Sequence, residues 1–280
     1  MAKSYFKNFK EVPLHSFIIQ TLFLIKENKI NNSYPKPRRK ITRTKLIHKM
    51  FKILLLLSFA FISAFATLGF DISSFQGAPD QSVFDCLKAQ GNEFAILQLW
   101  RGGPGINEYF AENYRKTKAA GISKVDAYAF FCNNCTGNTP TNICSSIKSN
   151  LPEGFDGLIW LDIEDCKGCW KGTPNERLSF VMLVAITCAT KGLKLGVYSG
   201  HGSWEQVFGS ADFDAQGLKG LPLWYAHYDG VQDYSDWETI KFGGWKAPVM
   251  KQYLGGKPIC GTTADSNFKE SQSNDEVIIY

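Results

Sequence analysis

The chain has 280 residues, eight cysteines and a formal net charge of +5. Its positive charge is confined to the front. Of the 31 Lys and Arg and the 26 Asp and Glu, residues 1–66 contain 13 and 2, which leaves 18 basic and 24 acidic residues and a charge near −6 for residues 67–280. This distribution argues against a basic protein that binds an anionic polymer such as nucleic acid.

The N-terminal region predicts export. Met50-Phe51-Lys52 is a short charged start, residues 53–64 form an apolar run, and Ala64-Phe65-Ala66 is a small-x-small cleavage site. The apolar run is too short for a comfortable membrane span, so we expect no membrane association once it is removed. We therefore interpret residues 50–66 as a signal peptide and expect a secreted protein or one of the phagosomal or lysosomal lumen.

The segment before this signal, residues 1–49, shows no sustained hydrophobic period. We interpret it as a non-native upstream extension or as disordered. A basic tail for nuclear targeting or nucleic-acid binding is the alternative, but a signal peptide behind such a tail would make no sense. Residues 67–280 then form a single catalytic domain.

These 214 residues have the size of one α/β domain. Strands and helices alternate up to residue 199, after which the helical pattern fades. The predicted strands are 69–73, 94–99, 125–131, 158–165, 195–199, 221–228, 249–254 and 260–264, and the predicted helices are 81–90, 107–120 and 174–191. This order favours a distorted TIM-like barrel whose last three strands lack most of their helices. A doubly wound sheet is the alternative, although no glycine-rich phosphate loop follows the first strand.

The start of the last predicted helix is the best defined. Thr173 is a suitable cap, Pro174 fits the first helical position, and Glu176 completes a capping box with Thr173. Gly192 ends the helix.

All eight cysteines follow the predicted cleavage site. An even number of cysteines behind a secretion signal favours disulfides, although their pairing cannot be deduced from spacing. The motifs Cys132-x-x-Cys135 and Cys166-x-x-Cys169 also have the spacing of a four-thiolate zinc site. An oxidising compartment competes for these thiols, and His201 and His227 lack a metal-ligand spacing, so we expect neither a metal nor a cofactor.

The segment 158–165 is the most informative part of the chain. It is apolar enough for a strand buried on both faces, yet it ends in carboxylates. Side chains alternate along a strand, so one face carries Leu158, Trp160, Asp162 and Glu164. Two acids that leave a buried strand on one face need partners or a task, because desolvation opposes their charge. The alternative is a strand end that runs into a charged loop.

Two further acids are expected beside this pair. Asp71 lies in the first predicted strand and Asp265 closes the last one. In a barrel of this kind the carboxyl ends of the strands meet at one mouth, where Asp71, Asp162, Glu164 and Asp265 would converge. Mutual repulsion would raise at least one pKa, which keeps one carboxylic acid protonated and able to donate its proton.

Several blocks of the chain, in the same order, resemble the glycoside hydrolase family 25 lysozymes. The blocks are Gly69-Phe70-Asp71-Ile72-Ser73, Ala119-Ala120-Gly121, Tyr128-Ala129-Phe130, Leu161-Asp162-Ile163-Glu164, Leu223-Trp224-Tyr225-Ala226-His227-Tyr228, Lys251-Gln252-Tyr253 and Ala264-Asp265-Ser266-Asn267. They cover nearly all of residues 68–268. The cysteine-rich segments 132–144 and 166–169 depart from the basic pattern and leave the rim of the groove open to question.

The resemblance implies a lysozyme of bacterial peptidoglycan, which cuts the β-1,4 bond between N-acetylmuramic acid and N-acetylglucosamine for digestion or defence. By it, Glu164 looks like the general acid/base, and Asp162 orients the 2-acetamido group in a retaining reaction or acts as nucleophile. Asp71 and Asp265 would tune this pair and hold substrate. Candidate substrate-binding residues are Tyr128, Trp224, Tyr225, Gln252 and Tyr253, although aromatic residues near strand ends pack as often as they stack on sugars. We expect a monomer whose partner is the cell-wall polysaccharide.

Two other functions are kept open. A chitinase-type hydrolase also uses an Asp-x-Glu strand end, usually with a further Asp two residues earlier, where this chain has Trp160. An inactive relic that binds peptidoglycan is the non-enzymatic alternative, but it is hard to reconcile with four retained acids.

Removal of residues 50–66 has a direct consequence for mass. The exported protein is expected to begin at Thr67, or within one or two residues of it, because Ala66 ends the predicted cleavage site. Intact-mass spectrometry of the exported protein measures this. An exported form that keeps residues 36–40 would contradict both the signal peptide and the acidic net charge.

Overall fold

Residues 66–270 are described by a computed structural model of the chain, so residues 1–49 and all but the last residue of the predicted signal peptide lie outside the described part. Eight strands close into a barrel in chain order. They are β1 (Ala66–Ile72), β2 (Asn92–Arg101), β3 (Lys124–Phe130), β4 (Ile159–Asp162), β5 (Leu195–Gly200), β6 (Leu223–Ala226), β7 (Met250–Ile259) and β8 (Thr262–Glu270). The neighbours from β1 to β7 are parallel, whereas β8 runs antiparallel to both β7 and β1. The predicted distorted TIM-like barrel is confirmed.

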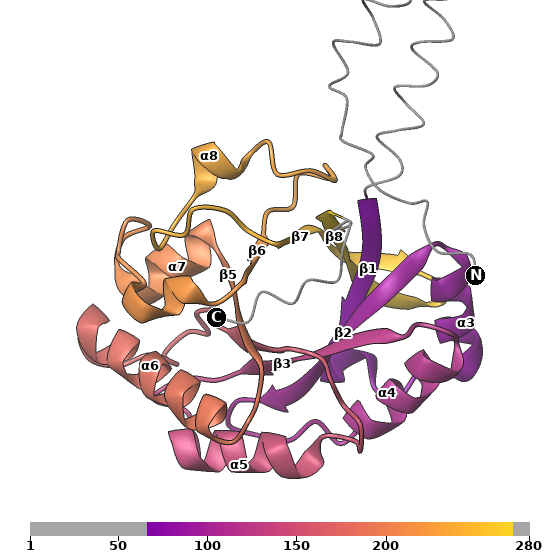
Figure 1. Ribbon diagram of the computed structural model, residues 1–280, viewed down its shortest axis with the longest axis horizontal. Helices are drawn as coiled ribbons and strands as arrows, with labels where there is room; N and C mark the ends of the chain where they lie inside the picture. Colours follow the sequence, from indigo (N-terminus) through magenta and orange to yellow (C-terminus); the bar gives the residue numbers. More distant parts are fainter. Residues whose placement is uncertain (1–65, 271–280) are drawn as a thin grey trace, which may run out of the picture. The chain divides into compact units, whose positions relative to one another are not determined.

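Helices cover the outside of the barrel up to β6 (Figure 1). The α-helices are α3 (Gln81–Ala89), α4 (Phe110–Ala119), α5 (Pro140–Asn150), α6 (Pro174–Thr190), α7 (His201–Phe208) and α8 (Trp237–Ile240), and the short 3-10 helices are η1 (Ser74–Gln76) and η2 (Gln216–Gly220). As expected, helices shrink late in the chain, to the four residues of α8. Within residues 66–270 no helix combines the length and the apolar character that a membrane span requires.

The sequence pattern missed α5 and α7 and misplaced some boundaries. Helix α5 buries Ile143, Cys144 and Ile147, but its other positions are mostly polar and it follows a cysteine-rich loop. Strand β4 ends at Asp162, so Glu164 lies in the loop behind it. The predicted strand 260–264 contains the turn of a long hairpin, where Cys260 and Gly261 have φ of 52° and 79°.

Alternation along the strands separates an inner core from an outer one. Phe94, Ile96, Trp160, Tyr198, Trp224 and Met250 fill the barrel, while a larger apolar cluster lies between the barrel and its helices. Trp160 is 2% exposed and lies opposite Gly196 of β5, where a Cβ atom would overlap the indole ring. The expected face of Trp160 is therefore correct, and its ring packs the centre of the barrel.

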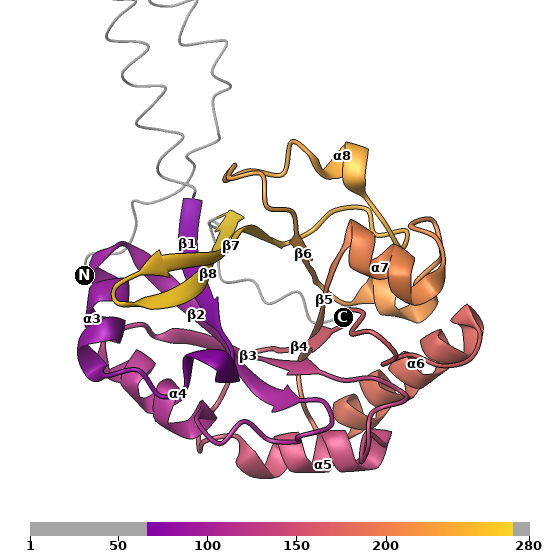
Figure 2. The same cartoon turned by 180° about the vertical axis from the view of Figure 1, so that it is seen from behind.

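All eight described cysteines are paired as disulfides, as expected. Cys86–Cys260 joins α3 to the tip of the β7–β8 hairpin (Figure 2), and Cys144–Cys188 joins α5 to α6. Cys132–Cys135 and Cys166–Cys169 close two short loops, and their four sulfur atoms lie within 4.8 Å of one another. These loops follow β3 and β4, so the disulfides brace the rim on that side.

Replacement of Gly196 by alanine tests the packing of Trp160. We expect Gly196→Ala to lower the free energy of unfolding by about 1–3 kcal/mol, the usual effect of overpacking a filled core. Gly220→Ala is the matched control, because a Cβ there meets open space and its effect should stay within about 0.5 kcal/mol. Denaturant unfolding measures both, and equal stabilities of the two variants would contradict the packing argument.

Candidate active site

The four predicted acids line one cavity of about 620 Å³ at the mouth of the barrel. Asp71 lies at the end of β1, Asp162 at the end of β4, and Glu164 in the loop two residues on. Asp265 was expected at the carboxyl end of the last strand, but the structure places it elsewhere. It lies within the antiparallel strand β8, directly opposite Asp71 in the register.

Gln252 joins the carboxylates of Asp71 and Asp265. Its Nε2 donates to Asp71 Oδ2 at 2.8 Å and to Asp265 Oδ2 at 3.1 Å. Asn267 Nδ2 donates a further hydrogen bond to Asp71 Oδ2 at 2.7 Å. Two carboxyl groups are thus held side by side on shared amide hydrogens, which lessens their repulsion without a cation.

The carbonyl side of the same amide is also occupied. Gln252 Oε1 accepts from the Tyr198 hydroxyl at 2.7 Å and from the Tyr228 hydroxyl at 2.8 Å. Gln252 is 2% exposed, so its orientation is fixed by four hydrogen bonds in a buried setting. The amide therefore sets where the two acids lie.

Burial raises the pKa of every acid in this group. For Asp71, desolvation and then the charge of Asp265 raise the pKa to about 8, against the hydrogen bonds of Asn267 and Gln252. Desolvation, followed by the charges of Glu164 and Asp71, raises the pKa of Asp162 well above its usual range.

The same holds for the other two acids. Burial and the charge of Asp265 raise the pKa of Glu164, although a hydrogen bond from Ser203 opposes them. Burial raises the pKa of Asp265, against the backbone N–H of Gly256. The site thus favours protonated carboxyl groups at pH values where exposed acids have lost their protons.

Asp162 differs from its neighbours in hydrogen bonding. Its side chain is buried, and Oδ1 has no hydrogen-bond partner among the described residues. A buried polar atom without a partner is destabilising unless it serves a purpose. Asp162 lines the cavity, and this oxygen keeps an unused capacity to accept a hydrogen bond.

Only some of the candidate substrate-binding residues lie at the cavity, because side chains alternate between the two faces of a strand. Tyr128 lines the cavity, and Gln252 lies at its acids. Trp224 faces the barrel interior, where it packs on Tyr198 and donates to Asn267 Oδ1 at 2.9 Å. It supports the floor and is 1% exposed.

Tyr225 and Tyr253 are not brought to the cavity. Tyr225 is the next residue after Trp224 and therefore points outward, where it is fully buried against Trp237. The Tyr253 hydroxyl accepts from Gln232 in the loop after β6. Neither ring is in a position to stack on a sugar in the cavity.

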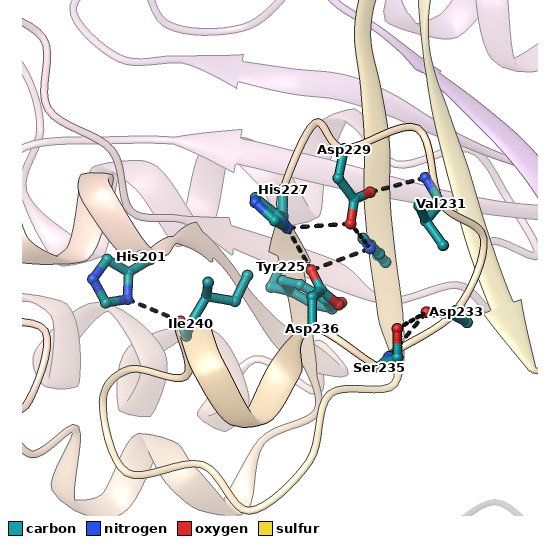
Figure 3. A network of polar contacts seen from close by, with 10 residues as sticks. His201, Tyr225, His227, Asp229, Val231, Asp233, Ser235, Asp236 and Ile240 are labelled. Atoms are coloured by element: carbon teal, nitrogen blue, oxygen red, sulfur yellow. Dashed lines mark hydrogen bonds and ion pairs between the residues drawn. The ribbon is translucent and has the colours of Figure 1, made fainter.

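A second polar network holds the loop that follows β6 (Figure 3). Lys251, which is fully buried, pairs with Asp229 Oδ2 at 2.8 Å and with Asp236 Oδ2 at 3.1 Å, and His227 Nδ1 bonds Asp236. His227, Asp229 and Asp236 have the spacing of metal ligands, but the ammonium group already supplies the cation between the two acids. The loop carries Tyr228, so the network places this hydroxyl against Gln252.

Asp236 is kept ionised by this network. Burial acts to raise its pKa, but hydrogen bonds from Tyr225, His227 and Lys251, together with the ammonium charge, outweigh it, so the pKa is lowered. The pKa of Asp236 is thus shifted in the opposite direction to those of the four cavity acids, because hydrogen-bond donors and an ammonium group surround it.

Sequence reasoning did not single out Tyr198, Ser203, Tyr228 and Asn267 as site residues. Asn267 had a usable signal, since it lies two residues after Asp265 and therefore on the same face of the strand. Ser203 belongs to the unpredicted helix α7, and no local pattern marks it. The two tyrosines are recognisable only once β5 and the loop after β6 are known to converge on Gln252 of β7.

A family model described as lysozyme-like protein 1 matches residues 63–253. The chain belongs to the glycoside hydrolase family 25 lysozymes. Among curated relatives from Dictyostelium discoideum, probable GH family 25 lysozyme 3 is 39% identical over 80% of this chain and 44% of its own length. Counting factor 45-1 is 38% identical over 79% of this chain and 74% of that protein. The chain thus spans less than half the length of probable GH family 25 lysozyme 3.

Solved structures show the same fold. A family GH25 lysozyme from Aspergillus fumigatus matches with a TM-score of 0.60 over 74% of this chain and 95% of that one, at 19% identity. The autolysin LytC of Streptococcus pneumoniae, in complex with a synthetic peptidoglycan ligand, matches with a TM-score of 0.55 over 72% of this chain and 46% of that one, at 15% identity.

The raised pKa of Asp71 makes stability depend on pH. The folded protein holds this proton up to about pH 8, whereas the unfolded chain releases it near pH 4. Between these values the folded state binds more protons, so the free energy of unfolding falls as the pH rises. We expect Asp71→Asn, which can accept the same hydrogen bonds, to remove much of this fall.

Thermal unfolding at pH 4, 6 and 8 measures the effect. Asp212→Asn, at an exposed aspartate, is the control and should keep the pH dependence of the wild type. A dependence in Asp71→Asn as steep as that of the wild type would show that the burial of Asp71 does not control it.

Proposed function

We propose that the protein hydrolyses the β-1,4 bond between N-acetylmuramic acid and N-acetylglucosamine in bacterial peptidoglycan. One observation carries the proposal: Glu164, whose pKa burial raises, shares a cavity with Asp162, which has an unpartnered buried oxygen. The first is suited to donate a proton and the second to accept a hydrogen bond from substrate. Family membership supports the reaction class.

The reaction begins with proton transfer from the Glu164 carboxyl to the glycosidic oxygen, which allows the bond to the leaving sugar to break. Asp162 Oδ1 accepts the N–H of the 2-acetamido group and orients its carbonyl oxygen towards the anomeric carbon. This oxygen forms the new bond at that carbon as the leaving group departs. The ionised Glu164 then takes a proton from water, which opens the cyclic intermediate from the original face.

The overall configuration is therefore retained, with the acetamide rather than an enzyme carboxylate as nucleophile. The unpartnered oxygen of Asp162 supports this role, because a substrate N–H would complete its hydrogen bonding. Asp71 and Asp265 lie next to this pair, where the charge of Asp265 helps to keep Glu164 protonated.

The choice of a bacterial wall polymer draws on two further points. The LytC structure of the same fold was solved with a synthetic peptidoglycan ligand, and Trp160 lies below Asp162, where a chitinase-type strand would carry a third acid. The other alternative is an inactive binding protein. Such a protein would not require four buried acids, whose desolvation lowers the stability of the fold. The biological role would be digestion of bacteria or defence against them.

We also propose that the protein works outside the cytosol, in a secreted form or in a phagosomal or lysosomal lumen. The four disulfides of residues 66–270 support this location, since oxidising compartments preserve such bonds. The mass of the exported protein is the direct test.

Replacement of the proton donor tests the reaction. We expect Glu164→Gln to fold normally and to lose at least about 100-fold in the rate of wall lysis, because it removes a positioned general acid. Asp162→Asn should also be severely impaired. Rates on bacterial walls and on chitin, measured on the same preparations, separate the lysozyme from the chitinase alternative.

The control is Glu205→Gln, at an exposed glutamate of α7, which should keep wild-type activity. Wall lysis by Glu164→Gln within a few-fold of the wild type would refute the assignment. A wild type that binds walls but cleaves neither polymer would identify the inactive alternative.

A further inference from the structure

Arg101 is the only basic residue among the described residues that line the acidic cavity. The lining also contains five acids, namely Asp71, Asp162, Glu164, Asp165 and Asp265. Whenever one of these carboxyl groups is ionised it repels an anionic ligand, except where a cation offsets it locally. The position of Arg101 therefore decides where a negative group of the substrate is tolerated.

A bulge in β2 turns Arg101 towards the cavity. The register between β2 and β3 pairs Gln98 with Tyr128 but Trp100 with Ala129, so one residue of β2 is skipped. Beyond the bulge Trp100 packs in the outer core, and Arg101 lies opposite Phe130, a residue of the cavity lining. Without the bulge, simple alternation would direct Arg101 away from the site, and bulges commonly redirect side chains in this way.

The backbone around Arg101 is held firmly. Its N–H donates to Gly105 O at 2.8 Å, and Gly105 N–H donates to Gly102 O at 3.0 Å, which closes a tight turn directly after β2. Asn107 N–H returns to Leu99 O at 2.9 Å. The guanidinium group is therefore presented from a fixed base.

The hydrogen-bonding capacity of this guanidinium is largely unused within the protein. Its ion pair, from Nη2 to Glu108 Oε2, is long at 3.6 Å, and the Glu108 side chain is itself 59% exposed. Nε is buried and makes no hydrogen bond to any described residue. An arginine has five donors in a planar fork that matches a carboxylate, so Arg101 has donors available for a ligand.

We propose that Arg101 binds a carboxylate carried by the glycan and thereby favours muramic-acid polymers over uncharged ones. This inference rests on the proposed function and extends it to the recognition of the substrate. The carboxylate has two possible sources, the lactyl group of N-acetylmuramic acid when no peptide is attached, and the stem peptide when one is. Phe75, which lines the same cavity and is 93% exposed, adds an apolar surface to it.

Four substrates test the proposal: peptide-stripped glycan with free lactyl carboxylates, its neutral methylamide derivative, peptide-bearing glycan, and the methylamide derivative of that polymer. The wild type is expected to prefer the charged member of one pair by about tenfold in kcat/KM, the effect of a charge-assisted hydrogen bond. In Arg101→Gln this preference should fall to about one. The pair in which it falls identifies the source of the carboxylate.

Two variants sharpen the test. Arg101→Lys should keep part of the preference, since it retains the charge and loses the planar fork. Arg115→Gln, at an exposed arginine of α4 outside the cavity, should leave the preference of the wild type unchanged. A wild type without any preference, or an Arg101→Gln protein that keeps it, would overturn the proposal.

Binding separates this proposal from the proposed function. Calorimetry measures binding without turnover. It gives the dissociation constants of the four polymers for the Glu164→Gln protein and for the double variant Glu164→Gln with Arg101→Gln. A wild type that cleaves none of the polymers refutes the proposed function, while a charge preference in binding that is lost with Arg101 still supports the carboxylate site. Equal binding of charged and neutral polymers refutes it.

Discussion

The burial of four carboxyl groups at one end of a closed barrel is the constraint on which the site depends. Among the described residues no cation pairs directly with these four acids, so desolvation and repulsion are relieved by hydrogen bonds and by protonation. The amide of Gln252 supplies the hydrogen bonds that Asp71 and Asp265 share. The remaining unfavourable energy appears as raised pKa values, and the proposed proton donation by Glu164 depends on them.

The barrel supports this arrangement from below and from the side. Trp160 and Trp224 fill its interior beneath the acids, so water cannot reach them from that direction. The buried pairs of Lys251 with Asp229 and Asp236 fix the loop that brings Tyr228 to Gln252. The network around Lys251, in which the pKa of Asp236 is lowered, thus helps to position the acids whose pKa values are raised.

The rim of the cavity is built by segments outside the regular barrel. The two short disulfide loops after β3 and β4 lie against each other, and Asn134 N–H donates to Cys169 O across them at 2.9 Å. Arg101 also lines the cavity, where the bulge in β2 adds a positive charge to an acidic lining. In the proposed function the floor carries out bond cleavage, whereas the rim, with Arg101, sets substrate preference.

The sequence alone determined the features that obey local rules. The capping box of Thr173 and Glu176 is present as expected, because it depends on residues three positions apart. The inward face of Trp160 and Asp162 follows from the alternation of a strand, and the order of strands and helices was sufficient for the barrel class. Tertiary structure decided the rest, because it depends on residues distant in sequence. The antiparallel register of β8 places Asp265 opposite Asp71, and chain geometry selects the disulfide partners. The bulge in β2 reverses the direction of Arg101, and which of Trp224 and Tyr225 faces inward is set by how β6 enters the barrel.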